Sequence, residues 1–174
     1  MKDDAPLIVP RPNPRTARFR FVTQEHSLFG RLIRWRTMAR ISHVEMVLPD
    51  GSIIAALSDR GVVHVDGDYD TTSTMQIFVD IPLFDTDLLR WISYLRSRVG
   101  RPYDWNAVYG EALFLDWRFP GGMICSMLAA LSLREAGVFP RPLSEPAHEI
   151  SPRDLLLILS AHPAAIVHPP ETRK

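Results

Sequence analysis

The sequence contains only one cysteine, Cys125, in 174 residues, so a disulfide within the chain is excluded and a reducing compartment is favoured. It also lacks any apolar run near the roughly 18 residues that are needed to cross a bilayer. Residues 1–6 show no basic segment leading into an apolar stretch, as a signal peptide has. We therefore expect a cytoplasmic protein without stable membrane insertion, unless a dedicated secretion route or cell lysis releases it.

The chain carries no excess of either charge, because 20 Lys and Arg residues balance 20 Asp and Glu residues. A nucleic-acid-binding domain usually has a basic balance, so we expect no nucleic-acid partner. The basic cluster of residues 31–36 and Arg40 is interpreted as the solvated side of an amphipathic helix. His148, His162 and His168 lie in proline-rich sequence, and no metal-ligand spacing such as His-Glu-x-x-His occurs. We expect neither a metal nor another cofactor.

Apolar residues are plentiful enough to form one core. With 46% hydrophobic and 23% charged residues, a chain of this length needs no metal or disulfide to stabilise a single domain. Prolines gather at both ends, and proline suits neither a helix interior nor a central strand. We expect an extended lead-in at residues 1–17, one domain at residues 18–162 and a loose tail at residues 163–174.

The spacing of apolar residues changes from a strand period to a helix period along the chain. Alternation predicts antiparallel strands at residues 18–22, 42–48, 52–56, 61–66 and 75–80. A spacing of three and four residues predicts helices at residues 28–38, 85–99, 104–115, 125–136 and 152–159. We expect Asp85 or Thr86 to cap the second of these helices, and Ser151 with Asp154 to cap the last. The fold class is therefore α+β.

Cys125 stands where the helix of residues 125–136 begins, directly after a flexible Gly121-Gly122 segment. The free N–H groups and the positive end of a helix favour a thiolate over a thiol. A cysteine with an ordinary pKa near 8.5 is only about 3% thiolate at pH 7, so a nucleophile also needs a nearby imidazole. The alternative is a cysteine that only fills the core, as single cysteines often do.

His43 is the candidate imidazole. It opens an alternating segment that runs into Asp50-Gly51 and then resumes, which predicts a β-hairpin with an Asp-Gly turn. Because side chains alternate along a strand, His43 and Glu45 share one face and Val44 the other. A histidine on a strand beside a cysteine at a helix start is the arrangement of papain-like cysteine hydrolases.

An ordered set of short motifs resembles the circularly permuted branch of the NlpC-type papain-like superfamily, which also contains the lecithin:retinol acyltransferase-like enzymes. The set comprises Ser42-His43, Asp50-Gly51, Gly61-Val62, residues 100–105 and Cys125-Ser126. In the permuted branch the histidine strand precedes the cysteine, as it does here. The likeness covers residues 18–137. It implies a papain-like fold in which an antiparallel sheet or half-barrel presents His43 and packs against helices that carry Cys125.

The resemblance also implies a thiol-dependent hydrolase. His43 takes the thiol proton, and the Cys125 thiolate attacks a carbonyl carbon to form an acyl-enzyme, with the Cys125 backbone N–H in the oxyanion hole. We expect an amide in a peptidoglycan stem peptide or a related small peptide as substrate. Lipid acyl transfer or ester hydrolysis is the alternative, and a degenerate binding module is the third reading. The candidate substrate-contacting residues are Tyr103, Asp104, Trp105 and Ser126.

One position departs from the family pattern. Members of the family commonly carry a polar residue twelve positions after the histidine to orient the imidazole, and here that residue is Ala55. Glu45, roughly 7 Å from His43 along the same strand face, is the nearest substitute. Asp104, His64 and Ser58 are further alternatives, and Asp104 is equally expected to cap a helix.

Aromatic residues are concentrated just before Cys125. Most of them are expected to lie in the core, with one or two lining a groove for an acyl chain or a peptide. They are Tyr103, Trp105, Tyr109, Phe114, Trp117 and Phe119.

Overall fold

The computed structural model describes residues 9–13, 15–23, 40–69, 72–113, 119–139 and 146–172. The described strands are β1 (Thr16–Thr23), β2 (His43–Val47), β3 (Ile53–Leu57), β4 (Gly61–Val65), β5 (Met75–Pro82), β6 (Ile166–Val167) and β7 (Glu171–Thr172). They form one sheet in the order β4-β3-β2-β1-β5-β6, with β7 also paired to β5. All of these pairings are antiparallel.

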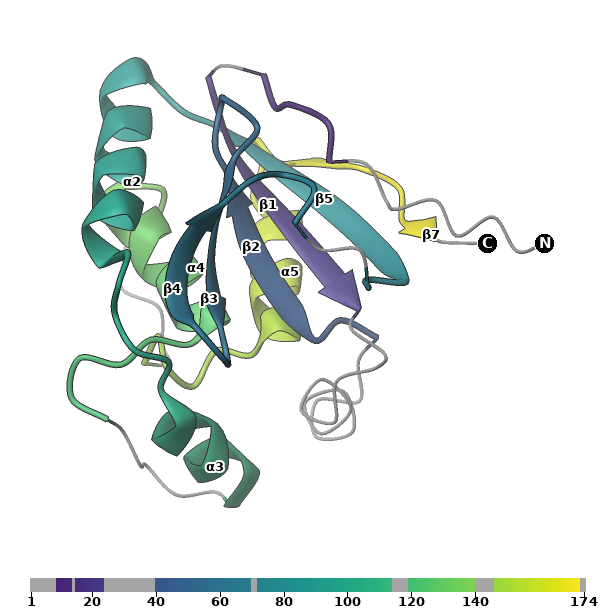
Figure 1. Cartoon of the computed structure of the whole chain (residues 1–174). Coiled ribbons are helices and arrows are strands. Elements are labelled where there is room, and N and C mark those ends of the chain that lie inside the picture. Colours follow the sequence, from purple (N-terminus) through teal and green to yellow (C-terminus); the bar gives the residue numbers. More distant parts are fainter. Residues whose placement is uncertain are drawn as a thin grey trace.

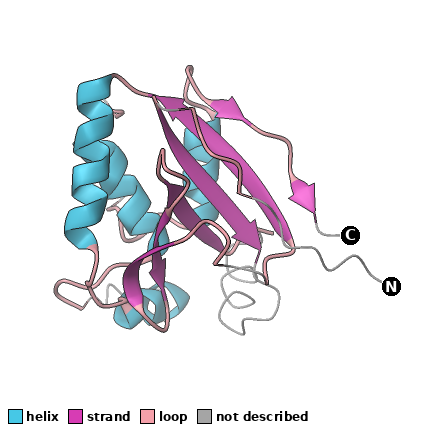
Figure 2. Cartoon of the chain, turned by 45° about the horizontal axis from the view of Figure 1, so that its top comes forward, coloured by secondary structure: helices cyan, strands magenta, loops and turns pink. Residues whose placement is uncertain are grey.

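The described helices follow the first five strands in the chain. They are α2 (Asp85–Arg98), α3 (Trp105–Leu113), α4 (Cys125–Glu135) and α5 (Pro152–Ser160). Helices α2, α4 and α5 cover one face of the sheet, whereas α3 projects beyond its end (Figure 1). The turned view in Figure 2 shows the same layers of sheet and helices. The fold is thus α+β with an antiparallel sheet packed against helices, which confirms the fold class expected from the sequence.

The main core lies between the sheet and these three helices. Phe19 of β1 and Trp91 of α2 meet edge to face with ring centroids 5.8 Å apart, and the indole N–H of Trp91 donates to Ser132 of α4 at 3.0 Å. Val44 and Met46 of β2 belong to the same buried cluster. The alternation expected for β2 is therefore confirmed, because Val47 packs in a separate cluster on the opposite face.

That opposite face is covered as well. Val47 packs there with Ala55 of β3 and Phe78 of β5, and Val9 of the lead-in lies over this small cluster. Beside it, polar side chains of the central strands are buried rather than solvated; they are Arg18, Arg20, Glu45, Gln76 and Asp80. The sheet therefore has an apolar interior on one face and a partly ionic interior on the other.

Two expected boundaries are wrong. Strand β1 begins at Thr16, so the lead-in ends before residue 17. The tail that is expected to be loose at residues 163–174 is attached in its described part, residues 163–172, because β6 and β7 both pair with β5. Its backbone also continues this attachment: the N–H of His168 donates to the carbonyl of Phe78 at 2.9 Å. The prolines are accommodated because Pro163 precedes β6, and Pro169 and Pro170 lie between β6 and β7.

Of the two helix caps predicted from the sequence, one is confirmed and one is wrong. The capping box of α5 is confirmed, since Ser151 accepts from the backbone N–H of Asp154 while the Asp154 carboxylate accepts from that of Ser151. The expected cap of α2 is wrong: Phe84 is its N-cap residue and makes no side-chain hydrogen bond. None of the helices in the described ranges is long and apolar enough to cross a membrane.

Several expectations fall on residues outside the described ranges. They are the helix at residues 28–38, the basic cluster at residues 31–36, and Phe114 and Trp117.

Candidate active site

Cys125 is the first residue of α4, as the sequence predicts, and Ile124 is the N-cap residue. The loop that leads into α4 is hydrogen-bonded to residues 102–104, which precede α3. The N–H of Met123 donates to the carbonyl of Pro102, and the N–H of Asp104 donates to the carbonyl of Met123. Gly122 is required there: a Cβ would lie 2.8 Å from the Cβ of Asp104. Helix α4 therefore starts at a fixed place beside β2.

His43 of β2 and Cys125 are in contact. The thiol and the imidazole are hydrogen-bonded, and the backbone N–H groups of Val44 and Ser126 also bond the sulfur. Burial is the largest single influence and by itself raises the pKa of Cys125, but the charge of His43 and these three hydrogen bonds outweigh it. The pKa of Cys125 is therefore lowered from its ordinary value, which favours a thiolate paired with an imidazolium.

Glu45 also lies beside the imidazole. Its Oε1 is 3.6 Å from Nε2 of His43, and its Oε2 is 3.1 Å from Nη1 of Arg20 on β1. The hydroxyl of Tyr69 donates to Oε1 as well. Glu45 and Arg20 are both fully buried, and Cys125 and His43 are only 3% and 6% exposed. The site is thus a buried row that runs from thiol to imidazole to carboxylate to guanidinium.

Two of the three alternatives for orienting His43, Asp104 and His64, have other partners. The Asp104 carboxylate accepts from the N–H groups of Ala107 and Phe119, at 2.9 and 3.0 Å, and so caps α3. His64 of β4 lies 2.7 Å from the hydroxyl of Ser52. Ser58 lies in the turn of residues 58–60 between β3 and β4. Of these residues, Glu45 is the one for which the structure shows an ion pair with His43.

The expected substrate-contacting residues are divided between the interior and the surface. Ser126 is buried, and its hydroxyl has no hydrogen-bond partner among the described residues. Tyr103 and Trp105 meet edge to face at 5.3 Å, and Trp105 stacks on Tyr109 at 6.0 Å. Trp105, Tyr109 and Phe119 are exposed, so the expectation that most of these aromatics lie in the core is wrong for the described ones.

Helix α3 is anchored next to Cys125 by its other face. Ala107 and Val108 pack on Ile124, the residue that precedes the cysteine, and Tyr103 and Met127 border this cluster. The aromatic face of α3 therefore lies outward while its small apolar face holds the start of α4 in place.

Sequence reasoning missed Arg20 and Tyr69, which both contact the Glu45 carboxylate. Arg20 stands in the alternating run Arg18-Phe19-Arg20-Phe21, a pattern that usually marks a strand with one solvated face. Two arginines on a face that also presents a candidate catalytic histidine were the available signal for a charged interior.

Comparisons with known proteins add a likeness in fold. No protein-family model and no curated protein matches the chain. A solved structure resembles it with a TM-score of 0.64, covering 91% of this chain and 98% of that one: the crystal structure of metalloprotein yiiX from Escherichia coli O157:H7, DUF1105. The two sequences are 13% identical. Within the described ranges of this chain, no group of three or more His, Cys, Asp or Glu side chains is placed to hold a metal ion.

Proposed function

We propose that the chain is a cysteine hydrolase of the permuted papain-like type, with Cys125 as nucleophile, His43 as general base and Glu45 as the residue that orients the imidazole. The observation that carries the proposal is the buried contact between Cys125 and His43, in which the pKa of the thiol is lowered despite its burial. The order of His43 before Cys125, and an antiparallel sheet packed on the cysteine helix, are consistent with the permuted arrangement.

The reaction follows from this geometry. His43 holds the thiol proton as an imidazolium beside Glu45, and the thiolate attacks the carbonyl carbon of the substrate. The developing oxyanion is stabilised by the backbone N–H of Cys125, because the first N–H groups of a helix have no acceptor within it. The bond to the leaving amine breaks as the imidazolium returns its proton to the amine. Water then attacks the thioester with His43 as base, and the C–S bond breaks to release the acid and restore the thiol.

We place an amide of a small peptide, such as a peptidoglycan stem peptide, first among substrates. Because Cys125 and His43 are almost enclosed, the reacting carbonyl must be carried on a slender chain. The Asp104 carboxylate is occupied by backbone N–H groups, so it is a support and not a substrate ligand. Ser126 remains a candidate ligand, because its buried hydroxyl has no partner in the described part of the protein.

One observation favours a lipid substrate instead. Trp105, Tyr109 and Phe119 are exposed near the start of α4, and such amphipathic rings suit a membrane surface or an acyl chain. Lipid acyl transfer or ester hydrolysis by the same residues is therefore the second candidate function.

Incubation of the purified protein with digested peptidoglycan, and separately with phospholipid vesicles, separates the two. We expect muropeptides to be cleaved by the wild-type protein and not by Cys125→Ala. Release of fatty acid or lysolipid that depends on Cys125, with muropeptides intact, would support the second function. If neither substrate is turned over and the thiol has ordinary reactivity, the chain is not a hydrolase of this kind.

A further inference from the structure

The buried row does not end at Glu45. Arg20 donates through Nε to Oε1 of Gln76 on β5 at 2.8 Å, in addition to its contact with Glu45. Gln76 in turn donates through Nε2 to Oε2 of Glu171 on β7 at 2.6 Å. Arg20 and Gln76 are both fully buried, whereas Glu171 is exposed. A continuous set of polar contacts thus connects β7, near the C-terminus, to the imidazole of His43.

Each contact in this row fixes the next one. The amide of Gln76 has its oxygen toward a guanidinium donor and its nitrogen toward a carboxylate, so both neighbours favour the same orientation of the amide. Arg20, held from that side, reaches one oxygen of Glu45, and the Tyr69 hydroxyl holds the other. The carboxylate is therefore held beside His43 by partners that do not themselves touch the thiol.

A pair as deeply buried as Arg20 and Glu45 is expected to contribute little net stability to the fold. Removing both charges from water carries a large desolvation penalty, and an apolar pair of similar volume is often as stable. The arginine does have a direct electrostatic effect: it compensates the negative charge of a carboxylate that has no access to water. Charge at Glu45 in turn favours the imidazolium form of His43, and hence the thiolate.

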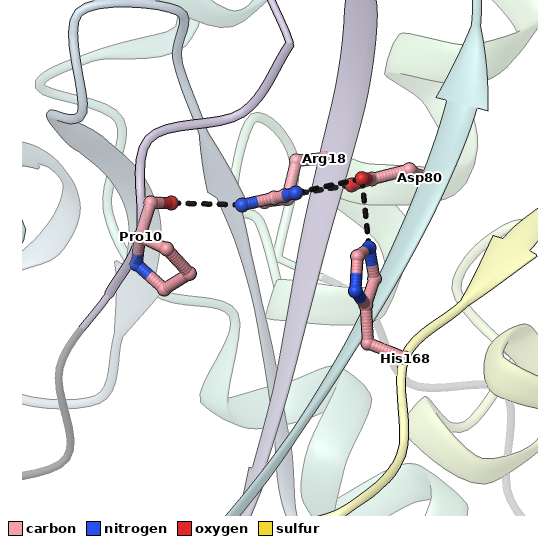
Figure 3. Close-up of polar contacts among 4 residues, drawn as sticks. All are labelled: Pro10, Arg18, Asp80 and His168. Carbon is pink, nitrogen blue, oxygen red and sulfur yellow. Dashed lines mark hydrogen bonds and ion pairs between the residues drawn. The ribbon is translucent and has the colours of Figure 1, made fainter.

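A second polar network on β1 and β5 can be compared with the row that contains Arg20 and Gln76. Arg18 makes two contacts of 2.7 Å with Asp80, whose carboxylate is also 2.9 Å from Nε2 of His168 (Figure 3). Nη1 of Arg18 donates to the carbonyl of Pro10 in the lead-in at 2.8 Å. This network fastens the tail to β5 with the same types of side chain, but none of its contacts involves His43, Glu45 or Cys125.

We propose that Arg20 and Gln76 are positioning residues for His43, and that Glu171 completes their row, so that the docked C-terminal segment sets the charge and orientation of the catalytic imidazole. The inference rests on the proposed function. Removing the Glu171 carboxylate lets the Gln76 amide turn, which places its N–H groups against the guanidinium of Arg20. A loosened guanidinium holds Glu45 less well, and the thiolate loses part of its support.

The titratable groups that face this site come from several elements. Glu45 and His43 both lie on β2 and face each other. Glu45 also faces Arg20, which is on β1, and Tyr69, which follows β4. Asp104 lies beside the loop that leads to Cys125, and its carboxylate is held by N–H groups. A change in the titration of Cys125 in variants of Arg20 or Glu171 is therefore transmitted through Glu45 and His43.

The test is the pH dependence of alkylation of Cys125 by iodoacetamide, measured together with thermal unfolding. We expect Arg20→Met to move the midpoint of the alkylation rate against pH upward, by roughly one unit in the apparent pKa of Cys125. Alkylation at pH 6 should then be slower by about tenfold. Arg20→Lys keeps the charge but not both contacts and should recover part of the loss. Glu171→Lys, at an exposed position, should move the midpoint in the same direction by a smaller amount.

Two controls separate positioning from stability. Arg18→Met breaks the comparison network and should lower the melting temperature without moving the midpoint. Glu135→Lys makes the same change of charge as Glu171→Lys at an exposed end of α4 and should also leave the midpoint in place. If Arg20→Met does not fold, the Lys variants at positions 20 and 171 decide the question.

The two hypotheses fail in different ways. A wild-type thiol that is inert at pH 6 contradicts the proposed function. A reactive wild-type thiol whose midpoint is unchanged in folded Arg20 and Glu171 variants contradicts the positioning role alone, as does an equal shift in the Arg18→Met control.

Discussion

Nε2 of His43 lies 3.6 Å from Oε1 of Glu45, two residues along the same strand. In the proposed function this carboxylate takes the role that the resemblance assigns to a residue on the next strand, where this chain has Ala55. Strands β2 and β3 pair with Met46 opposite Ile54, and continuing that register by one residue places Ala55 opposite Glu45. A methyl group there leaves the neighbourhood of Glu45 to Arg20 and Tyr69, which hold both carboxylate oxygens.

Glu45→Gln should lower Cys125-dependent turnover by about a hundredfold, because the neutral amide no longer compensates the imidazolium. The same change leaves Arg20 buried without its counter-charge, which costs on the order of 3 kcal/mol of stability. Turnover is therefore measured well below the melting temperature of the variant. Glu149→Gln, at an exposed glutamate outside the row, is the control. Equal turnover in folded Glu45→Gln would remove Glu45 from the site.

His43→Gln should raise the pKa of Cys125 above its ordinary value. Without the imidazole charge, burial opposes only the N–H groups of Val44 and Ser126. The rate of alkylation of the single cysteine, followed by mass spectrometry from pH 5 to pH 10, should therefore lose its component below about pH 8. His64→Gln on β4 is the matched control and should keep the wild-type profile. Identical profiles for His43→Gln and the wild type would mean that the imidazole does not activate the thiol.

Local rules in the sequence predicted much of what positions the site. The Asp50-Gly51 turn is present, with Gly51 at a φ of 89° and its N–H bonded to the carbonyl of Leu48. Helix α4 begins at Cys125, and Gly137 follows its end with a φ of 69°. Such features depend on residues close in sequence, because a positive φ or a free helix end restricts the residue types that fit.

Long-range pairing could not be inferred in the same way. Gln76 and Glu171 are 95 residues apart, and the short strands β6 and β7 are stabilised as strands by β5 and not by their own sequence. The charged face of β1 has the pattern of a solvated strand, yet the lead-in and the tail cover it. Its burial, and with it the role of Arg20, depends on contacts that no local pattern encodes.

Asp104→Ala should destabilise the protein by about 1 to 2 kcal/mol, the usual cost of losing a helix cap. Its carboxylate accepts from Ala107 at the start of α3 and from Phe119 in the following loop. Asp104→Asn keeps an acceptor oxygen and should retain most of this stability. Urea unfolding measures the difference between the two variants. If Asp104→Asn instead lost turnover while keeping its stability, the carboxylate would have a catalytic role that the structure does not indicate.

Asp80 should make the protein sensitive to acid. Burial by itself raises the pKa of Asp80, but hydrogen bonds and charges from Arg18 and His168 outweigh it, so the pKa lies below the ordinary value of 3.8. Because the folded-state pKa is the lower one, Asp80 contributes stability above about pH 4 that is lost as the pH falls through the folded-state value. Asp80→Asn should therefore be less stable than the wild type at pH 7, and the gap should narrow as the pH falls below about 4.

Urea unfolding of both proteins between pH 2.5 and pH 7 measures that gap. Asp85→Asn is the control, because Asp85 forms an ion pair with Arg15 in which both side chains are well exposed, at 66% and 73%. Exposed pairs contribute little, so this variant should follow the wild type at every pH. At low pH the protonated Asp80 and the asparagine are both neutral and leave Arg18 equally uncompensated, which is why the gap should narrow. A gap that stays constant down to pH 2.5 would show that Asp80 acts through packing and not through its charge.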